Sequence, residues 1–283
     1  MLSIRQEAPI DQTLHEVLSH VRDVAAGLDV DFFVGGAMAR DILLTHVHGI
    51  PQSRATRDVD LGVYVKEWAV FLELKKRLVE KARFKDAPGE SQRLHFQGTP
   101  LDLIPFGGIS EDGATISWPP KHDEIMNIVG FEEAFEASIM VDLGHDLVVR
   151  TCTLPSLAVL KLVAWKDRHN QSNKDANDFL LIAERYGEPL NQDRLWETES
   201  TLLGQVDHSF LRAGAHLLGK DCAGLCRPES VQQILSIFND PRLRQLLIDQ
   251  LVRIKAGSLD EYMEDKIAQV IDDFLAGFGH GPN

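Results

Sequence analysis

The hydrophobic pattern of this chain changes near residue 150. Before that point, short apolar runs typical of strands alternate with stretches whose apolar residues recur every three or four positions. From residue 154 onward nearly every stretch has helical spacing. Alternating strands and helices are typical of an α/β or α+β domain, whereas a run of helices must bury its apolar faces in a core of its own. We therefore predict two domains, residues 1–150 with a sheet flanked by helices, and a helical domain over residues 151–283.

The composition is typical of a globular protein of a reducing compartment. Of the 283 residues, 44% are hydrophobic and 25% charged, and no apolar window is long enough to predict a membrane span. The N-terminal segment lacks a secretory pattern, and three cysteines are too few for a disulfide framework, so we expect a cytoplasmic protein without membrane contact. The net charge of −14 disfavours broad nucleic-acid binding but leaves room for a local basic groove.

A glycine pair lies where a predicted strand meets a predicted helix. The strand is VDFFV, the pair is Gly35 and Gly36, and the helical spacing resumes in AMARDILLTHV. Glycine lets an anion approach the backbone amides closely, and the start of a helix favours negative charge. The pair by itself indicates a turn, and it becomes informative in combination with the carboxylates that follow.

Residues 57–65, RDVDLGVYV, carry two aspartates in a strand-prone segment. Alternate side chains of a strand share a face, so Asp58 and Asp60 lie on one face and Val59 and Leu61 on the other. Carboxylates are poor strand formers and are expensive to desolvate, so a strand with two of them needs a reason. Taken alone, the pair favours a solvated edge strand.

A third carboxylate, Asp102, stands between two leucines in a second apolar strand. The segment QRLHFQGTPLDLIPFGG predicts two strands joined by a Gly98-Thr99 turn, and the second strand carries Asp102. Mg²⁺ takes oxygen ligands and is commonly held between a few carboxylates and substrate phosphates. Together with the glycine turn, the three aspartates favour a metal site over a solvated edge.

Three segments together resemble the nucleotidyltransferase superfamily built on the DNA polymerase beta-like fold. They are FFVGGAMARDILL, RATRDVDLGV and LDLIPFG, which match its glycine pair, its Asp-x-Asp and its third acidic strand residue. The later segment LAVLKLVAWKDRHNQSNKDANDFLLI is similar to the helical motif of the AbiEii/AbiGii toxin group. The resemblance implies a mixed β-sheet flanked by helices, followed by a helical domain that contributes to the active-site cleft. The interval from Gly36 to Asp58 is longer than in minimal members, which leaves the shape of the nucleotide-side loop open.

The resemblance also implies roles for particular residues. Asp58, Asp60 and Asp102 would hold Mg²⁺ or Mn²⁺ and form the catalytic centre together with Lys161, a point-charge donor suited to a triphosphate. Nucleotide binding would fall to Gly35, Gly36, Arg40, Arg57, Lys161 and Asp175, with Asp178 ranked below them.

Several of these residues have structural alternatives. Lys161 is also consistent with a lysine whose stem lies along a surface helix. Asp175 is consistent with an acid that opens a helix, whereas the resemblance implies that it faces Lys161 or the nucleotide. Arg40 could instead pair with Asp41 or Asp58, and Arg54 and Arg57 could be ordinary solvated arginines.

The implied activity is transfer of a nucleoside monophosphate from an NTP to an acceptor hydroxyl, with release of pyrophosphate. In the resembled group the acceptor can be the 3′ end of tRNA, and the protein can be the toxin of a toxin–antitoxin pair with an antitoxin partner. Two alternatives stay open. One is a non-catalytic, partner-binding member of the same fold, and the other is transfer to a small molecule or a protein.

Overall fold

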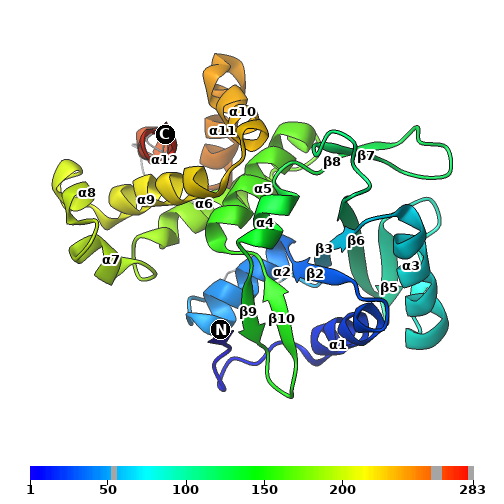
Figure 1. Ribbon diagram of the computed structural model, residues 1–283. Helices are drawn as coiled ribbons and strands as arrows, with labels where there is room; N and C mark the ends of the chain where they lie inside the picture. The colour runs from blue at the N-terminus through cyan, green and yellow to red at the C-terminus, as the bar shows by residue number, and fades with distance from the viewer. Residues whose placement is uncertain (52–55, 256–262, 280–283) are drawn as a thin grey trace. The chain divides into compact units, whose positions relative to one another are not determined.

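The computed structural model describes residues 1–51, 56–255 and 263–279, so Arg54 lies outside the described residues (Figure 1). The chain forms two compact units, Met1–Thr153 and Leu154–Asn283. The elements of the first unit are β1 (Leu2–Ser3), α1 (Gln12–Ala26), β2 (Asp31–Val34), α2 (Gly36–Asp41), the π-helix η1 (Ile42–Val47), β3 (Val59–Val65), α3 (Trp68–Ala82), β4 (Lys85–Asp86), β5 (Arg93–Phe96), β6 (Thr99–Gly107), β7 (Thr115–Ser117), β8 (Ile125–Asn127), α4 (Phe131–Glu136), β9 (Ile139–Asp142) and β10 (Val148–Thr151).

The first unit is built on a mixed sheet with strand order β1-β9-β10-β2-β3-β6-β5-β4. Strands β3 and β6 run parallel at its centre, whereas β2 is antiparallel to β3 and β5 is antiparallel to β6. Strands β7 and β8 form a separate small sheet. The predicted fold class, a mixed sheet flanked by helices, is confirmed.

The central strand β3 follows the predicted alternation. Val59, Leu61 and Val63 are fully buried, whereas Asp60 on the opposite face is partly exposed. Because side chains alternate along a strand, this burial sets the register: a slip of one residue would turn the carboxylate into the core.

Two local predictions need correction. The hairpin between β5 and β6 turns at Gln97 and Gly98, whose φ angles are 51° and 86°, and Thr99 is already in the strand. Two consecutive residues with positive φ are typical of the tight turn that matches the twist of a hairpin. The helix expected through AMARDILLTHV is divided, since α2 passes directly into the π-helix η1.

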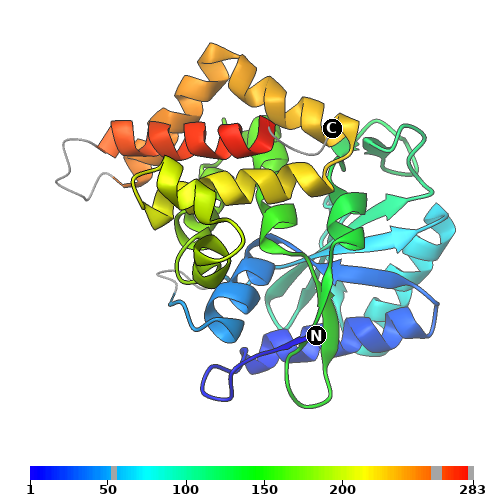
Figure 2. The same ribbon diagram turned by 60° about the vertical axis from the view of Figure 1, so that its left-hand side comes forward.

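The second unit consists of helices. They are α5 (Leu154–Arg168), α6 (Lys174–Tyr186), α7 (Gln192–Trp196), α8 (Ser200–Gln205), α9 (Phe210–Leu225), α10 (Pro228–Asn239), α11 (Pro241–Ile254) and α12 (Met263–Gly279). Helices α9 and α12 lie side by side, as the yellow and red ribbons of Figure 2 show. Within the described ranges, none of the helices combines the length and the hydropathy needed to span a bilayer.

Glycines allow α9 and α12 to approach closely. A Cβ atom added at Gly277 of α12 would lie 1.9 Å from the carbonyl oxygen of His216, and one at Gly219 of α9 would lie 1.9 Å from that of Phe274. These are backbone atoms, so neither helix can relieve the contact by moving a side chain. The two helices would have to separate and leave voids between their buried side chains.

We expect Gly277→Ala to lower the free energy of unfolding by about 1–3 kcal/mol, as overpacking of a close-packed interface does. Urea denaturation of the purified protein measures this. Gly224→Ala is the matched control, because Gly224 also lies in α9 but, outside its own stretch of helix, no heavy atom stands within 4 Å of its added Cβ. The control should leave stability unchanged or raise it by up to about 1 kcal/mol, through helix propensity. Equal stability of the two variants would contradict the close packing.

Candidate functional site

The glycine pair forms the turn between β2 and α2, and it lies directly against Asp60. The backbone N–H of Gly35 donates to the carbonyl oxygen of Asp60 at 2.8 Å. Gly36 has a φ of +59°, and a Cβ added there would lie 1.8 Å from Oδ2 of Asp60. A residue with a side chain would therefore displace the carboxylate. The structure thus brings the predicted glycine turn and one of the predicted strand carboxylates together.

Asp60 and Asp102 are neighbours across two parallel strands. The register of β3 with β6 pairs Asp60 with Asp102, so both side chains leave the same face of the sheet at the same level. Both are partly exposed between buried neighbours such as Leu61 and Leu103. We call Asp60 and Asp102 the carboxylate row. Asp58 stands two residues before Asp60, immediately ahead of β3, and is exposed.

Arg93 of β5 extends this row on the side away from Asp60. It is the register partner of Asp102, and its guanidinium binds both oxygens of that carboxylate, with Nε to Oδ1 at 2.7 Å and Nη2 to Oδ2 at 2.8 Å. Nη1 contacts Oε2 of Glu90 at 2.8 Å. The hydrogen bonds to Asp102 and the neighbouring negative charges raise the pKa of Arg93.

Sequence reasoning missed Arg93, although a usable signal was present. With the turn at Gln97 and Gly98, the hairpin pairs Phe96 with Thr99, and counting outward places Arg93 opposite Asp102. The turn predicted one residue too late would have shifted this pairing and hidden the contact.

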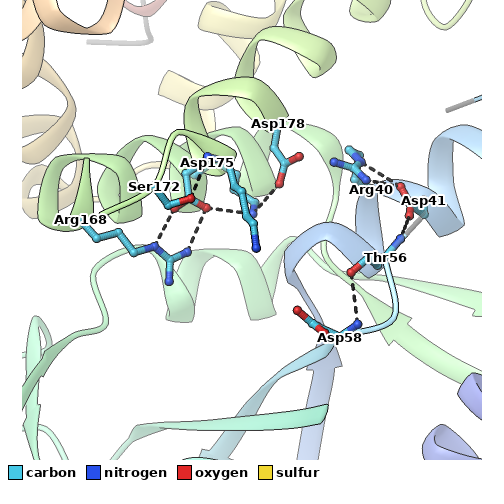
Figure 3. A network of polar contacts seen from close by, with 10 residues as sticks. Arg40, Asp41, Thr56, Asp58, Arg168, Ser172, Asp175 and Asp178 are labelled. Carbon is cyan, nitrogen blue, oxygen red and sulfur yellow. Dashed lines mark hydrogen bonds and ion pairs between the residues drawn. The ribbon is translucent and has the colours of Figure 1, made fainter. Parts of the chain in front are cut away.

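Arg40 and Asp58 belong to one chain of polar contacts (Figure 3). Arg40 is buried and donates to Oδ1 of Asp41 from Nε at 2.9 Å and from Nη2 at 2.6 Å. Oδ2 of Asp41 accepts from the backbone N–H of Thr56 at 3.1 Å, and Oγ1 of Thr56 accepts from that of Asp58 at 3.2 Å. Arg40 thus makes the predicted pair with Asp41, and its contact with nucleotide remains a prediction. This series of polar contacts supports the backbone that leads into β3. Arg57 is exposed.

The predicted residues of the second unit form a compact ion cluster, also drawn in Figure 3. Lys161 is 8% exposed, and its Nζ lies 3.0 Å from Oδ1 of Asp175 and 2.6 Å from Oδ2 of Asp178. Both aspartates are buried, and Asp175 also accepts two hydrogen bonds from Arg168, of 2.6 and 2.9 Å. The surface-lysine alternative for Lys161 is wrong. Its ammonium pairs with two carboxylates, and contact with a phosphate remains a prediction.

The pKa of Asp175 reflects a competition between burial and its cationic partners. Burial would raise it, but hydrogen bonds from Arg168 and the charges of Lys161 and Arg168 outweigh that effect and hold the pKa below its ordinary value of 3.8. The carboxylate therefore stays ionised inside the helical unit, because two cations compensate for its desolvation.

The donor chemistry of the first unit fits a divalent cation bound together with substrate. Among the described residues, no three His, Cys, Asp or Glu side chains gather closely enough to hold an ion on their own. Mg²⁺ in nucleotide sites, however, commonly binds one or two carboxylates plus phosphate oxygens and waters. Asp60 and its register partner Asp102, with Asp58 close by in sequence, provide such carboxylates, although both oxygens of Asp102 contact Arg93.

The fold and these side chains define an α/β protein with an acidic centre on two parallel strands beside a glycine turn. The chain belongs to the family of the nucleotidyl transferase AbiEii toxin of type IV toxin–antitoxin systems, whose model matches residues 18–276. The resemblance found in the sequence is therefore confirmed, and the protein is a member of a transferase family. The comparison with curated protein sequences gave no match.

Several solved structures are similar to this chain at low identity. The solution structure of the antibiotic-resistance factor ANT(2'')-Ia is 12% identical, covering 70% of this chain and 100% of that one, with a TM-score of 0.39. A nucleotidyltransferase-like protein from Paracoccidioides brasiliensis is 14% identical, covering 72% and 94%, with a TM-score of 0.40. A CCA-adding enzyme in complex with ATP is 12% identical, covering 95% and 80%, with a TM-score of 0.26. At this level of similarity, none of the three assigns an activity to this chain.

Proposed function

We propose that this protein transfers a nucleoside monophosphate from an NTP to an acceptor hydroxyl and releases pyrophosphate, in the presence of Mg²⁺ or Mn²⁺. The observation that carries the proposal is the contact of Gly36 with Asp60, next to Asp102 on the parallel strand. A triphosphate with a divalent cation needs carboxylates that can hold the cation. It also needs a nearby turn of glycines, which leaves the backbone amides open to the phosphates. Membership of the AbiEii family supports the same activity.

In this proposal the glycine turn and the three aspartates of the first unit have different tasks. The turn at Gly35 and Gly36 leaves the backbone open to phosphate oxygens. Asp58 and Asp60 hold the divalent cation, and Asp102 accepts the proton of the acceptor hydroxyl or adds an oxygen ligand. When bound, the cation supplies Lewis acidity and neutralises charge that develops on the phosphates. The series of polar contacts through Arg40, Asp41 and Thr56 keeps the backbone of Asp58 in place.

The experiment is transfer of label from each α-labelled NTP, with Mg²⁺, to total tRNA, other RNA, aminoglycosides or protein. We expect label on one acceptor class, and we expect Asp58→Asn/Asp60→Asn to lower the rate by at least about a thousandfold, since both ion-holding carboxylates are lost. Asp31→Asn is the matched control, because Asp31 is a 64%-exposed carboxylate of the adjacent strand β2 outside the proposed site. It should retain the wild-type rate.

Two results would refute the proposal. One is the absence of label on every acceptor class, and the other is full activity of the double variant. Expression of the wild type and of the double variant in cells gives a second test. A toxin should arrest growth, and the double variant should not.

The acceptor we place first is the 3′ end of tRNA, and a small cationic acceptor is the second candidate. The net charge of −14 favours the second, because an acidic surface attracts cations and repels a polyanion. The identity of the labelled product separates them, because tRNA and an added aminoglycoside can be resolved after one labelling reaction. A non-catalytic member that binds an antitoxin would bind no Mg-NTP in calorimetry.

A further inference from the structure

Arg93 places a fixed positive charge beside the carboxylate row. All three kinds of guanidinium nitrogen are engaged, Nε and Nη2 by Asp102 and Nη1 by Glu90. The side chain is held from both sides and is 30% exposed, while Asp102 is 15% exposed. A two-pronged arginine–carboxylate pair of this geometry fixes the plane of the carboxylate as well as its position.

Without a bound cation, the carboxylate row needs a positive charge nearby to reduce the repulsion between its two carboxylates. Asp60 and Asp102 are directly opposite each other on neighbouring strands, and like charges in that relation destabilise a sheet. Arg93 neutralises one of the two carboxylates from the far side, where it cannot come between them. The sheet therefore carries the acidic pair without a metal ion.

We propose that Arg93 is the built-in counter-cation of the carboxylate row, and that a divalent ion must compete with it for Asp102. This inference rests on the proposed function and adds a positioning residue to it. Both oxygens of Asp102 accept hydrogen bonds from Arg93, so a free ion gains less from this carboxylate than from a bare one. The consequence is that the site binds a free divalent ion weakly, and that the ion enters together with the phosphates of the NTP, which supply the missing oxygen ligands.

The test is calorimetric titration with Mn²⁺ alone, without nucleotide or acceptor. Arg93→Gln should bind Mn²⁺ roughly tenfold more tightly than wild type, the Coulomb effect of removing one unit charge a few ångströms from a dication in well-solvated surroundings. Arg93→Lys keeps the charge but not the two-pronged contact, and it should fall between the two. It also serves as the measurable variant if Arg93→Gln does not fold.

Arg77→Gln is the matched control for the loss of one positive charge. Arg77 lies on α3 of the same unit, has the same 30% exposure and pairs with Glu73. Its variant should bind Mn²⁺ as wild type does. Affinity that is unchanged or weaker in both Arg93 variants would overturn the inference and leave the proposed function standing. Absence of Mn²⁺ binding in wild type and in both Arg93 variants would also overturn the inference, because removal of the counter-charge would not have made Asp102 available to a free ion. The proposed function, in which the ion binds together with the phosphates of the NTP, is tested separately by the labelled-NTP assay.

Discussion

Lys161→Met is expected to lower the free energy of unfolding by about 3–5 kcal/mol, as removal of one partner from a buried ion pair does. Methionine keeps most of the apolar stem but removes the ammonium that pairs with Asp175 and Asp178. Both carboxylates are buried, so water cannot replace that ammonium without opening the packing of α5 against α6. Urea denaturation at neutral pH measures the loss.

Arg168→Met is the matched control, because Arg168 binds the same carboxylate of Asp175 but its side chain is 53% exposed. Solvent can partly replace an exposed guanidinium, so we expect a loss of about 1–2 kcal/mol, in the range of hydrogen bonds to a charged group. If Lys161→Met is no more destabilising than Arg168→Met, burial of the lysine is not what stabilises the cluster.

The loss of stability in Lys161→Met should also depend on pH. The pKa of Asp175 lies below 3.8, mainly because its cations outweigh the effect of burial, so the ion cluster stabilises the fold above that pH and ceases to do so as pH falls through the lowered pKa. A protonated carboxyl needs no counter-charge. The difference in stability between wild type and Lys161→Met should therefore be greatest near neutral pH and narrow below about pH 4.

Gly36→Ala should reduce the transfer rate by about a hundredfold, the effect of misplacing a catalytic group by about 1 Å. The φ of Gly36 is +59°, a left-handed conformation, and the new methyl group would lie 1.8 Å from Oδ2 of Asp60. The carboxylate proposed to hold the ion must move. The backbone conformation alone should lower stability by about 1–2 kcal/mol. Rates come from the labelled-NTP assay and stability from urea denaturation.

Gly35→Ala separates loss of glycine in general from the contact with Asp60. Gly35 has a φ of −118°, and the atom nearest to an added Cβ is Cε2 of Phe33 at 3.5 Å, an ordinary contact. Its stability should change by less than about 1 kcal/mol. Equal losses of stability at Gly35 and Gly36 would show that the close approach of Gly36 to Asp60 is not the cause.

Much of the first unit follows from local patterns that the sequence displays. The strand-turn-helix at the glycine pair, the alternation along β3 and the hairpin that carries Asp102 were all predicted, because each depends on periodicity and turn residues within about 20 positions. The helical character after residue 154 follows in the same way. The predicted roles of the site residues toward metal and nucleotide remain predictions.

Pairings between distant side chains were harder to predict. The resemblance implied that Asp175 faces Lys161 or the nucleotide, and in the structure it does pair with Lys161. The second carboxylate on that ammonium, Asp178 of the same helix α6, was not predicted as its partner. Arg93 was missed because its role depends on a hairpin register that the predicted turn placed one residue away. The π-helix η1 had no recognisable signal in the spacing of its apolar residues.

The sequence by itself determined the alternation of strands and helices in much of the first unit and the helical character of the second, because period and turn residues are local properties of the chain. It did not reveal the π-helix η1 or the short helix α4. It placed Asp60 on the face of the strand opposite Leu61, but it was wrong to place Asp58 in the same strand, because β3 begins at Val59. Only the tertiary structure decided that β6 lies parallel to β3 with Asp102 level with Asp60, that Gly36 packs on the Asp60 carboxylate, and that Arg93 neutralises Asp102. These contacts depend on strand order and register, which arise from the packing of the whole sheet and not from any one segment.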